Sequence, residues 1–308
     1  MIQLTKLTKR FGSRMAVNEL TLSVPAGEIY GLLGHNGAGK STAIGMMLGQ
    51  VWPSSGTAKV CGYDVTAHRC HALQKVGAIF ESPAFYDYLS GYRNLQILSS
   101  YTAPTSRERI AEVLDLVGLT GRDKNSVRTY SHGMRARLAL AQALLPKPEL
   151  LILDEPSDGL DPEGIHEMRQ TILRLQRELG LTILLSSHFL HEVEQTCTRI
   201  AVLNQGRMVF EGSLSSIRAR SPRVRLRVGD FEVASKQLRQ LGLIESSTES
   251  QSIALVDGVQ TDRVVRELVN MGMPVYEVAL EQETLEQFYL SLMSEHRAEA
   301  VAGGREPG

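Results

Sequence analysis

Residues 34–42 read GHNGAGKST, a complete GxxxxGK[ST] phosphate-binding loop (P-loop) between an apolar run, EIYGLL, and a helix-compatible segment, STAIGMML. Its glycines permit the backbone angles that let successive N–H groups curl around phosphate oxygens. Lys40 is placed to reach the β- and γ-phosphates, and the Ser41 hydroxyl suits a magnesium ion. The sequence therefore predicts a nucleoside triphosphate site. The residues of this stretch expected to contact the nucleotide are Gly34, His35, Asn36, Gly37, Ala38, Gly39, Lys40, Ser41 and Thr42.

Composition limits the classes of protein to which this chain can belong. Its 308 residues, 43% of them hydrophobic, are enough for one large or two ordinary domains. A net charge of -1 argues against nucleic acid as the main partner. The three cysteines include no CxxC pair, so neither a disulfide framework nor a standard zinc site is indicated, and reduced cytosol is the expected location.

Apolar runs in this chain are all shorter than the roughly 20 residues needed to span a bilayer. The N-terminal stretch MIQLTKLTKRFG also lacks the hydrophobic core of a signal peptide. If the protein serves a membrane, we expect another chain to cross it.

A second motif, LLILDE, occupies residues 150–155. Four apolar residues followed by two acids fit a parallel strand buried on both faces that ends at the ligand edge of an α/β sheet. We expect Asp154 to face the magnesium shell. Glu155 is the candidate general base that polarises the attacking water, a role worth about 10²- to 10⁴-fold in rate. The alternative is an acidic pair that faces solvent at the strand end.

The stretch YSHGMRAR at residues 130–137 precedes an apolar helical pattern, and Ser131 suits the N-cap of that helix. Here the chain resembles the ATP-binding cassette (ABC) family, whose LSGGQ signature occupies this place. Ser131 and Gly133 agree with the signature, whereas Tyr130, His132 and Met134 differ from it. The resemblance implies that this segment binds the γ-phosphate of ATP held by an opposing subunit.

Three more motifs follow the family order. SDGLD, at residues 157–161, resembles the family's D-loop and implies a role for Asp161 at the nucleotide. LTILLSSH is a buried-strand pattern that ends at His188, which corresponds to the family's switch residue near the γ-phosphate. Phe11 stands where the family keeps an aromatic ring that stacks on adenine, although a core position is the alternative. Together these motifs imply an ATP hydrolase that uses ATP and Mg²⁺, with Glu155, His188 and Lys40 as its catalytic residues.

Glu81 departs from the family pattern, which usually has glutamine at this position. A carboxylate beside phosphates and Mg²⁺ should either ligate the ion more strongly or stay partly protonated. We therefore expect Glu81 at the nucleotide and as a candidate metal ligand together with Ser41 and Asp154. Glutamate here resembles the bacitracin and lantibiotic type of antibiotic export and immunity ATPases.

Each nucleotide in this family lies between two subunits, and the chain holds no second GxxxxGK[ST]. Either a second copy of this chain or a related ATPase subunit would complete the pair, a homodimer being the simpler arrangement. The resemblance implies an exporter subunit that works with transmembrane permease subunits, peripheral on the inner face of the cell membrane. The alternative is a soluble ABC ATPase that acts on ribosomes, DNA or an assembly system.

The sequence changes in character after residue 213, where RVRLRVGD alternates apolar and arginine residues like a half-buried strand. Helical and extended patterns then follow in βαββαβ order. We expect an α/β P-loop NTPase of ABC type with a helical signature subdomain at residues 1–215 and a linker at 216–222. A small α+β accessory domain at 223–296 and a flexible tail at 297–308 complete this interpretation.

Overall fold

The computed structural model describes residues 1–80, 84–101, 105–218, 223–248, 251–256, 258–281 and 284–302. The chain divides into two compact units, Met1–Gly212 and Ser213–Gly308. The first unit holds the phosphate-binding loop. The predicted α/β class with a small α+β addition is confirmed, whereas the domain bounds proposed from the sequence stay a prediction.

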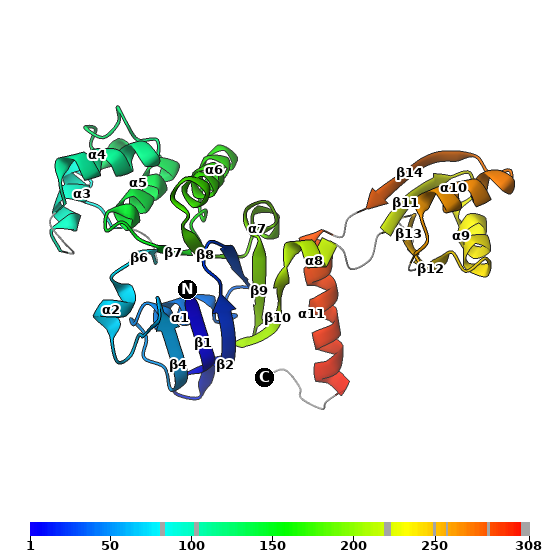
Figure 1. Ribbon diagram of the computed structural model, residues 1–308, viewed down its shortest axis with the longest axis horizontal. Coiled ribbons are helices and arrows are strands. Elements are labelled where there is room, and N and C mark those ends of the chain that lie inside the picture. The colour runs from blue at the N-terminus through cyan, green and yellow to red at the C-terminus, as the bar shows by residue number, and fades with distance from the viewer. Residues whose placement is uncertain are drawn as a thin grey trace. The chain divides into compact units, whose positions relative to one another are not determined.

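A six-stranded sheet forms the centre of the first unit, in the order β10-β9-β3-β8-β7-β6 (Figure 1). Its pairs from β6 through β7, β8 and β3 to β9 are all parallel. Every residue of β3 and β8 is buried, as expected for parallel strands covered on both faces. The strands are β3 Ile29–Leu33, β6 Val76–Ile79, β7 Leu150–Asp154, β8 Thr182–Ser187, β9 Arg199–Asn204 and β10 Arg207–Ser213.

A second, four-stranded sheet has the order β2-β1-β4-β5 and is antiparallel throughout. Its strands are β1 Ile2–Phe11, β2 Arg14–Val24, β4 Ser55–Val60 and β5 Tyr63–Asp64. Helix α1, Lys40–Met47, contacts β2 and β4 of this sheet and β7 of the other. The helix that follows the phosphate-binding loop therefore lies where the two sheets meet, and one apolar core is shared by residues of both.

Helices α3, α4 and α5 pack on one another and form the helical part of the first unit (Figure 1). Serine N-caps start all three helices, since the hydroxyls of Ser90, Ser106 and Ser131 accept hydrogen bonds from backbone N–H groups. The helices of this unit are α2 Arg69–Leu73, α3 Gly91–Ser99, α4 Arg107–Leu116, α5 His132–Leu144, α6 Pro162–Leu179 and α7 Leu190–Thr196, with a 3₁₀ turn at Val127–Thr129.

The second unit contains a four-stranded antiparallel sheet, β12-β13-β11-β14, with two helices in βαββαβ order. Val224, Leu226 and Val228 of β11 are buried, while the arginines between them are not, which confirms the predicted alternation. The elements are α8 Leu214–Arg218, β11 Arg223–Val228, α9 Phe231–Gln240, β12 Ile244–Ser247, β13 Ser252–Leu255, α10 Thr261–Asn270, β14 Val275–Glu281 and α11 Leu285–Ala302.

Helix α8 begins two residues before the segment expected to be a linker and ends inside it, and α11 extends into the segment expected to be a tail. Helices α8 and α11 contact each other. Within the described ranges, none of the helices combines the length and apolar character required to cross a membrane.

Candidate functional site

The phosphate-binding loop joins β3 to α1, so the N-terminus of α1 faces the loop. Gly39 has φ of 106°, and a Cβ there would lie 2.5 Å from the carbonyl oxygen of Ala16 on β2. Only glycine fits, because both the left-handed backbone and the close approach exclude a side chain. The loop therefore packs closely against the backbone of β2.

The turn between β9 and β10 supports the loop from another side. The Gly206 N–H donates to the carbonyl of Ala38 at 2.9 Å. The Gly206 carbonyl accepts from the Asn18 N–H at 2.8 Å. A Cβ on Gly206, at φ 77°, would lie 2.7 Å from the Ala16 carbonyl oxygen. Two glycines far apart in sequence thus converge on one carbonyl of β2.

Lys40, Glu155 and His188 form a chain of charged and hydrogen-bonding side chains at the ends of β3, β7 and β8. The Lys40 ammonium, only 5% exposed, donates to the Gly34 carbonyl at 2.7 Å and pairs with a Glu155 carboxylate oxygen at 3.1 Å. The other Glu155 oxygen lies 2.5 Å from Nδ1 of His188. The structure therefore brings together the three residues predicted to be catalytic.

Ser186 connects the ends of two neighbouring strands. Its hydroxyl donates to Asp154 at 2.5 Å and accepts from the Glu155 N–H at 3.0 Å. Glu155 itself has a φ of 49°, an uncommon left-handed conformation for a residue with a side chain. This bridge helps to hold Glu155 in that conformation, with its carboxylate directed to Lys40 and His188.

A pocket of about 340 Å³ lies over the loop. Phe11, half exposed, forms part of its wall, with Lys9 stacked over the ring at 4.8 Å. Arg14 and Ala16 also line the pocket and were missed from the sequence. Arg14 could have been found from the sequence, because it is a basic residue only three positions after Phe11. The predicted residues that line the pocket are Phe11, Asn36, Gly37, Gly39, Lys40, Ser41, Thr42 and Glu155.

His35 and Ala38 hold the loop itself. The ring of His35 bonds the Asn36 carbonyl at 2.8 Å and the Asn204 side chain at 3.2 Å. Ala38 is fully buried and bonds the His35 carbonyl at 3.0 Å through its N–H. Both residues were predicted to contact the nucleotide. In the structure the His35 ring and the Ala38 backbone N–H make hydrogen bonds within or beside the loop.

Oxygen donors for a hard cation are present next to this pocket. The Ser41 hydroxyl lies at the pocket wall, and Asp154 ends the neighbouring strand β7. In the described part of the chain no group of three or more His, Cys, Asp or Glu side chains could hold a metal by itself. This donor set fits Mg²⁺, which keeps several waters and shares phosphate oxygens, better than a metal caged by protein ligands alone.

The signature and D-loop residues cap helices. Ser131 caps α5 and accepts from the Met134 N–H at 3.2 Å, and Asp161 caps α6 and accepts from the Gly164 N–H at 2.9 Å. Gly133 is buried next to Gly164. Neither Ser131, Gly133 nor Asp161 lines the pocket over the phosphate-binding loop. Glu81 lies outside the described residues.

Glu192, on α7, is a partly buried acid near this site that sequence reasoning missed. Burial raises the pKa of its carboxyl above the ordinary value, and a hydrogen bond with Ser157 of the D-loop segment opposes that rise. It lies near His188, whose charge acts on it. Glu192 therefore links the D-loop segment to the end of β8.

Comparison with known proteins adds independent findings. Residues 17–158 match the family model described as ABC transporter. The chain is 38% identical to the uncharacterized ABC transporter ATP-binding protein YhcH of Bacillus subtilis, covering 97% of this chain and 98% of that protein. It is also 38% identical to the bacitracin transport ATP-binding protein BcrA of Enterococcus faecalis, covering 95% and 96%.

A solved structure, cbiO1 of Clostridium perfringens, described as part of the ABC transporter complex cbiONQ, is similar with a TM-score of 0.65. It is 25% identical in sequence, and the match covers 78% of this chain and 95% of that one. The sequence relatives thus span nearly the whole length of the chain, whereas this structural match covers less of it.

Proposed function

Because this chain belongs to the family of ABC transporter ATP-binding proteins, we propose that it powers an exporter. It hydrolyses ATP, as the family does, and separate transmembrane permease subunits carry the substrate. The observation that carries the catalytic part is the contact of Glu155 with both Lys40 and His188 over the phosphate-binding loop. The relative BcrA is named for bacitracin transport. We therefore propose an antibiotic or a peptide as the exported substrate, with efflux or self-immunity as the purpose of the export.

The contacts support the following assignment of catalytic roles. Lys40 holds the phosphates, Glu155 polarises the attacking water, and His188 orients Glu155 and contacts the γ-phosphate. Ser41 and Asp154 would hold Mg²⁺, and Glu81, which lies outside the described residues, would be a further ligand. The ion would supply charge neutralisation at the phosphates. Phe11 stacks on the adenine.

We further propose that two cassettes act together. Ser131, Gly133 and Asp161 lie away from the pocket of their own chain, and in a pair they would serve the nucleotide of the opposite subunit. Closure on ATP and release after hydrolysis would drive the permease through alternating states. The chain would then be peripheral at the inner face of the membrane, attached through its permease, with no nucleic acid partner.

The test is purification of the tagged chain from detergent-solubilised native membranes, followed by mass spectrometry. A multispanning protein recovered in stoichiometric amount supports the transporter subunit and identifies the chain that selects the substrate. Recovery of ribosomal, DNA-associated or other soluble partners alone would overturn it. Retention of the multispanning protein by a Glu155→Gln variant, which keeps the fold, controls for turnover-dependent association.

A further inference from the structure

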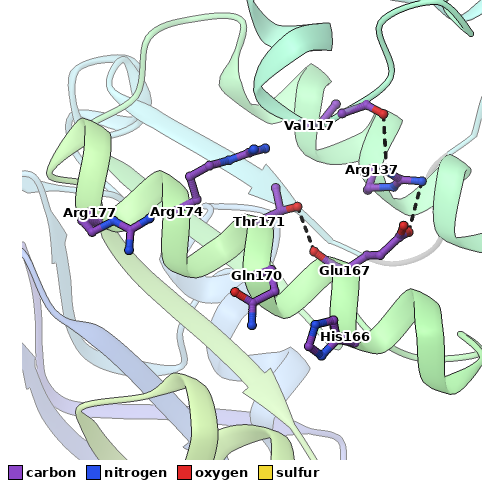
Figure 2. Close-up of a pocket in the computed structure, with 9 residues that line it drawn as sticks. Val117, Arg137, His166, Glu167, Gln170, Thr171, Arg174 and Arg177 are labelled. Carbon is purple, nitrogen blue, oxygen red and sulfur yellow. Dashed lines mark hydrogen bonds and ion pairs between the residues drawn. The ribbon is translucent and has the colours of Figure 1, made fainter.

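A second pocket of about 380 Å³ lies between α6 and the helical part of the first unit (Figure 2). Three segments line it: the residues after α4, one residue of α5, and a stripe of α6. The α6 stripe follows helical spacing, since Gln170, Arg174 and Arg177 recur at four and three residues. None of the residues that line it belongs to the pocket over the phosphate-binding loop.

The pocket is rich in positive charge. Arg137, Arg174 and Arg177 contribute three guanidinium groups, and Glu167 contributes the one carboxylate. Glu167 pairs with Arg137 at 3.2 Å, so the charge of the other two arginines has no acid to balance it among the lining residues. Two positive charges therefore remain in excess.

Hydrogen-bond donors also outnumber acceptors here. Arg137 donates to the Gly118 carbonyl at 3.4 Å (Figure 2). Arg174 donates to the Leu116 carbonyl. The Nε atoms of Arg137 and Arg174 are buried without any hydrogen-bond partner. A buried N–H without an acceptor costs about 1–3 kcal/mol. Because these two Nε atoms are closed off from solvent, they do not themselves face a ligand in the pocket. The excess positive charge of the lining arginines is what favours an anion there.

We propose that this pocket binds a compact phosphate-bearing anion with two or more negative charges, separately from the nucleotide site. Planar guanidinium groups match phosphate oxygens in geometry, and the excess charge of the pocket matches such a ligand. The amide of Gln170 supplies a further polar group in the lining, whereas the Thr171 hydroxyl already donates to the Glu167 carbonyl at 2.8 Å. The volume is within the range of small-ligand pockets.

The pocket lies between α5 and α6, so a ligand bound there can regulate the movement of one helix against the other. Arg137 lies in the helix that begins at Ser131, and Arg174 lies in the helix that begins at Asp161. An anion held by both arginines and Arg177 ties the helical part of the unit to α6. It thereby resists any rotation of the signature helix α5 against α6.

Calorimetric titration of the full-length Lys40→Ala variant with inorganic pyrophosphate tests the proposal, because this variant lacks the lysine of the nucleotide site. We expect one pyrophosphate to bind, with an affinity that falls as salt rises. Arg177→Gln in the same background should weaken binding at least ten-fold. Gln170→Glu, which adds a carboxylate at an exposed position of the pocket, should do the same.

The matched control is Arg107→Gln, at the far end of α4, which should leave pyrophosphate binding unchanged. Both pocket positions are exposed on α6, and circular dichroism checks that their variants are folded. Inorganic phosphate and ATP, titrated in the same way, distinguish a simple phosphate from a nucleotide source. Absence of pyrophosphate binding to the Lys40→Ala variant, or binding that neither pocket substitution weakens, would overturn the proposal.

Discussion

Replacement of Glu155 by glutamine is the sharpest perturbation of the proposed reaction. The amide keeps the size of the side chain but cannot take a proton from water. Loss of a general base costs about 10²- to 10⁴-fold in turnover, or roughly 3–5 kcal/mol of barrier. The contacts of Glu155 with Lys40 and His188 make a value in this range the expected result.

The same substitution acts on ATP binding through Lys40. The phosphates of ATP compete with the Glu155 carboxylate, 3.1 Å away, for an ammonium group that is only 5% exposed. A hydrogen bond to a charged partner contributes about 1.5–3 kcal/mol. Removing the competing charge should therefore leave ATP affinity unchanged or raise it, by about 100-fold at most.

Two assays separate these effects: phosphate release at saturating ATP, and equilibrium binding of a fluorescent ATP analogue. The control is Glu149→Gln, the same change just before β7 and at the opposite end of that strand, where Glu149 is exposed and pairs with Lys75. Turnover of Glu155→Gln within about five-fold of the parent would refute the base assignment. Much weaker ATP binding would refute the competition for Lys40.

Four further outcomes are expected. Ser186→Ala should lower the free energy of unfolding by about 1–3 kcal/mol in denaturant titrations and slow ATP turnover, because two hydrogen bonds are lost. Burial raises the pKa of Glu192 above its ordinary value, 4.5, so the unfolded chain loses this proton first and stability should fall as pH rises above 4.5. Glu192→Gln should remove this fall in stability above pH 4.5. An unchanged dependence of stability on pH would contradict the raised pKa of Glu192. A thiol reagent should label exposed Cys70 in the native protein but Cys197 only after unfolding, since burial raises the pKa of the Cys197 thiol. Phe11→Ala should weaken ATP binding about 10- to 100-fold in the fluorescence assay, through lost stacking.

The sequence predicted the parts of the site whose residue types the local backbone and chemistry require. The phosphate-binding loop needs glycine at Gly39, and a strand buried on both faces needs the apolar run before Asp154. Contacts between distant segments had no such local signal. Nothing near Ser186 indicated that its hydroxyl would join two strands, and nothing near Gly206 indicated a contact with the phosphate-binding loop.

The contact between Gly206 and the loop has a consequence for the order of protein synthesis. The loop leaves the ribosome early, but β9 and the turn that supports Ala38 leave it much later. Until they do, β3 lacks the neighbouring strand β9 and the loop lacks one side of its support. Ribosome-bound chains that end before Gly206 should therefore hold ATP poorly, and nucleotide can stabilise this unit only when its synthesis is almost finished.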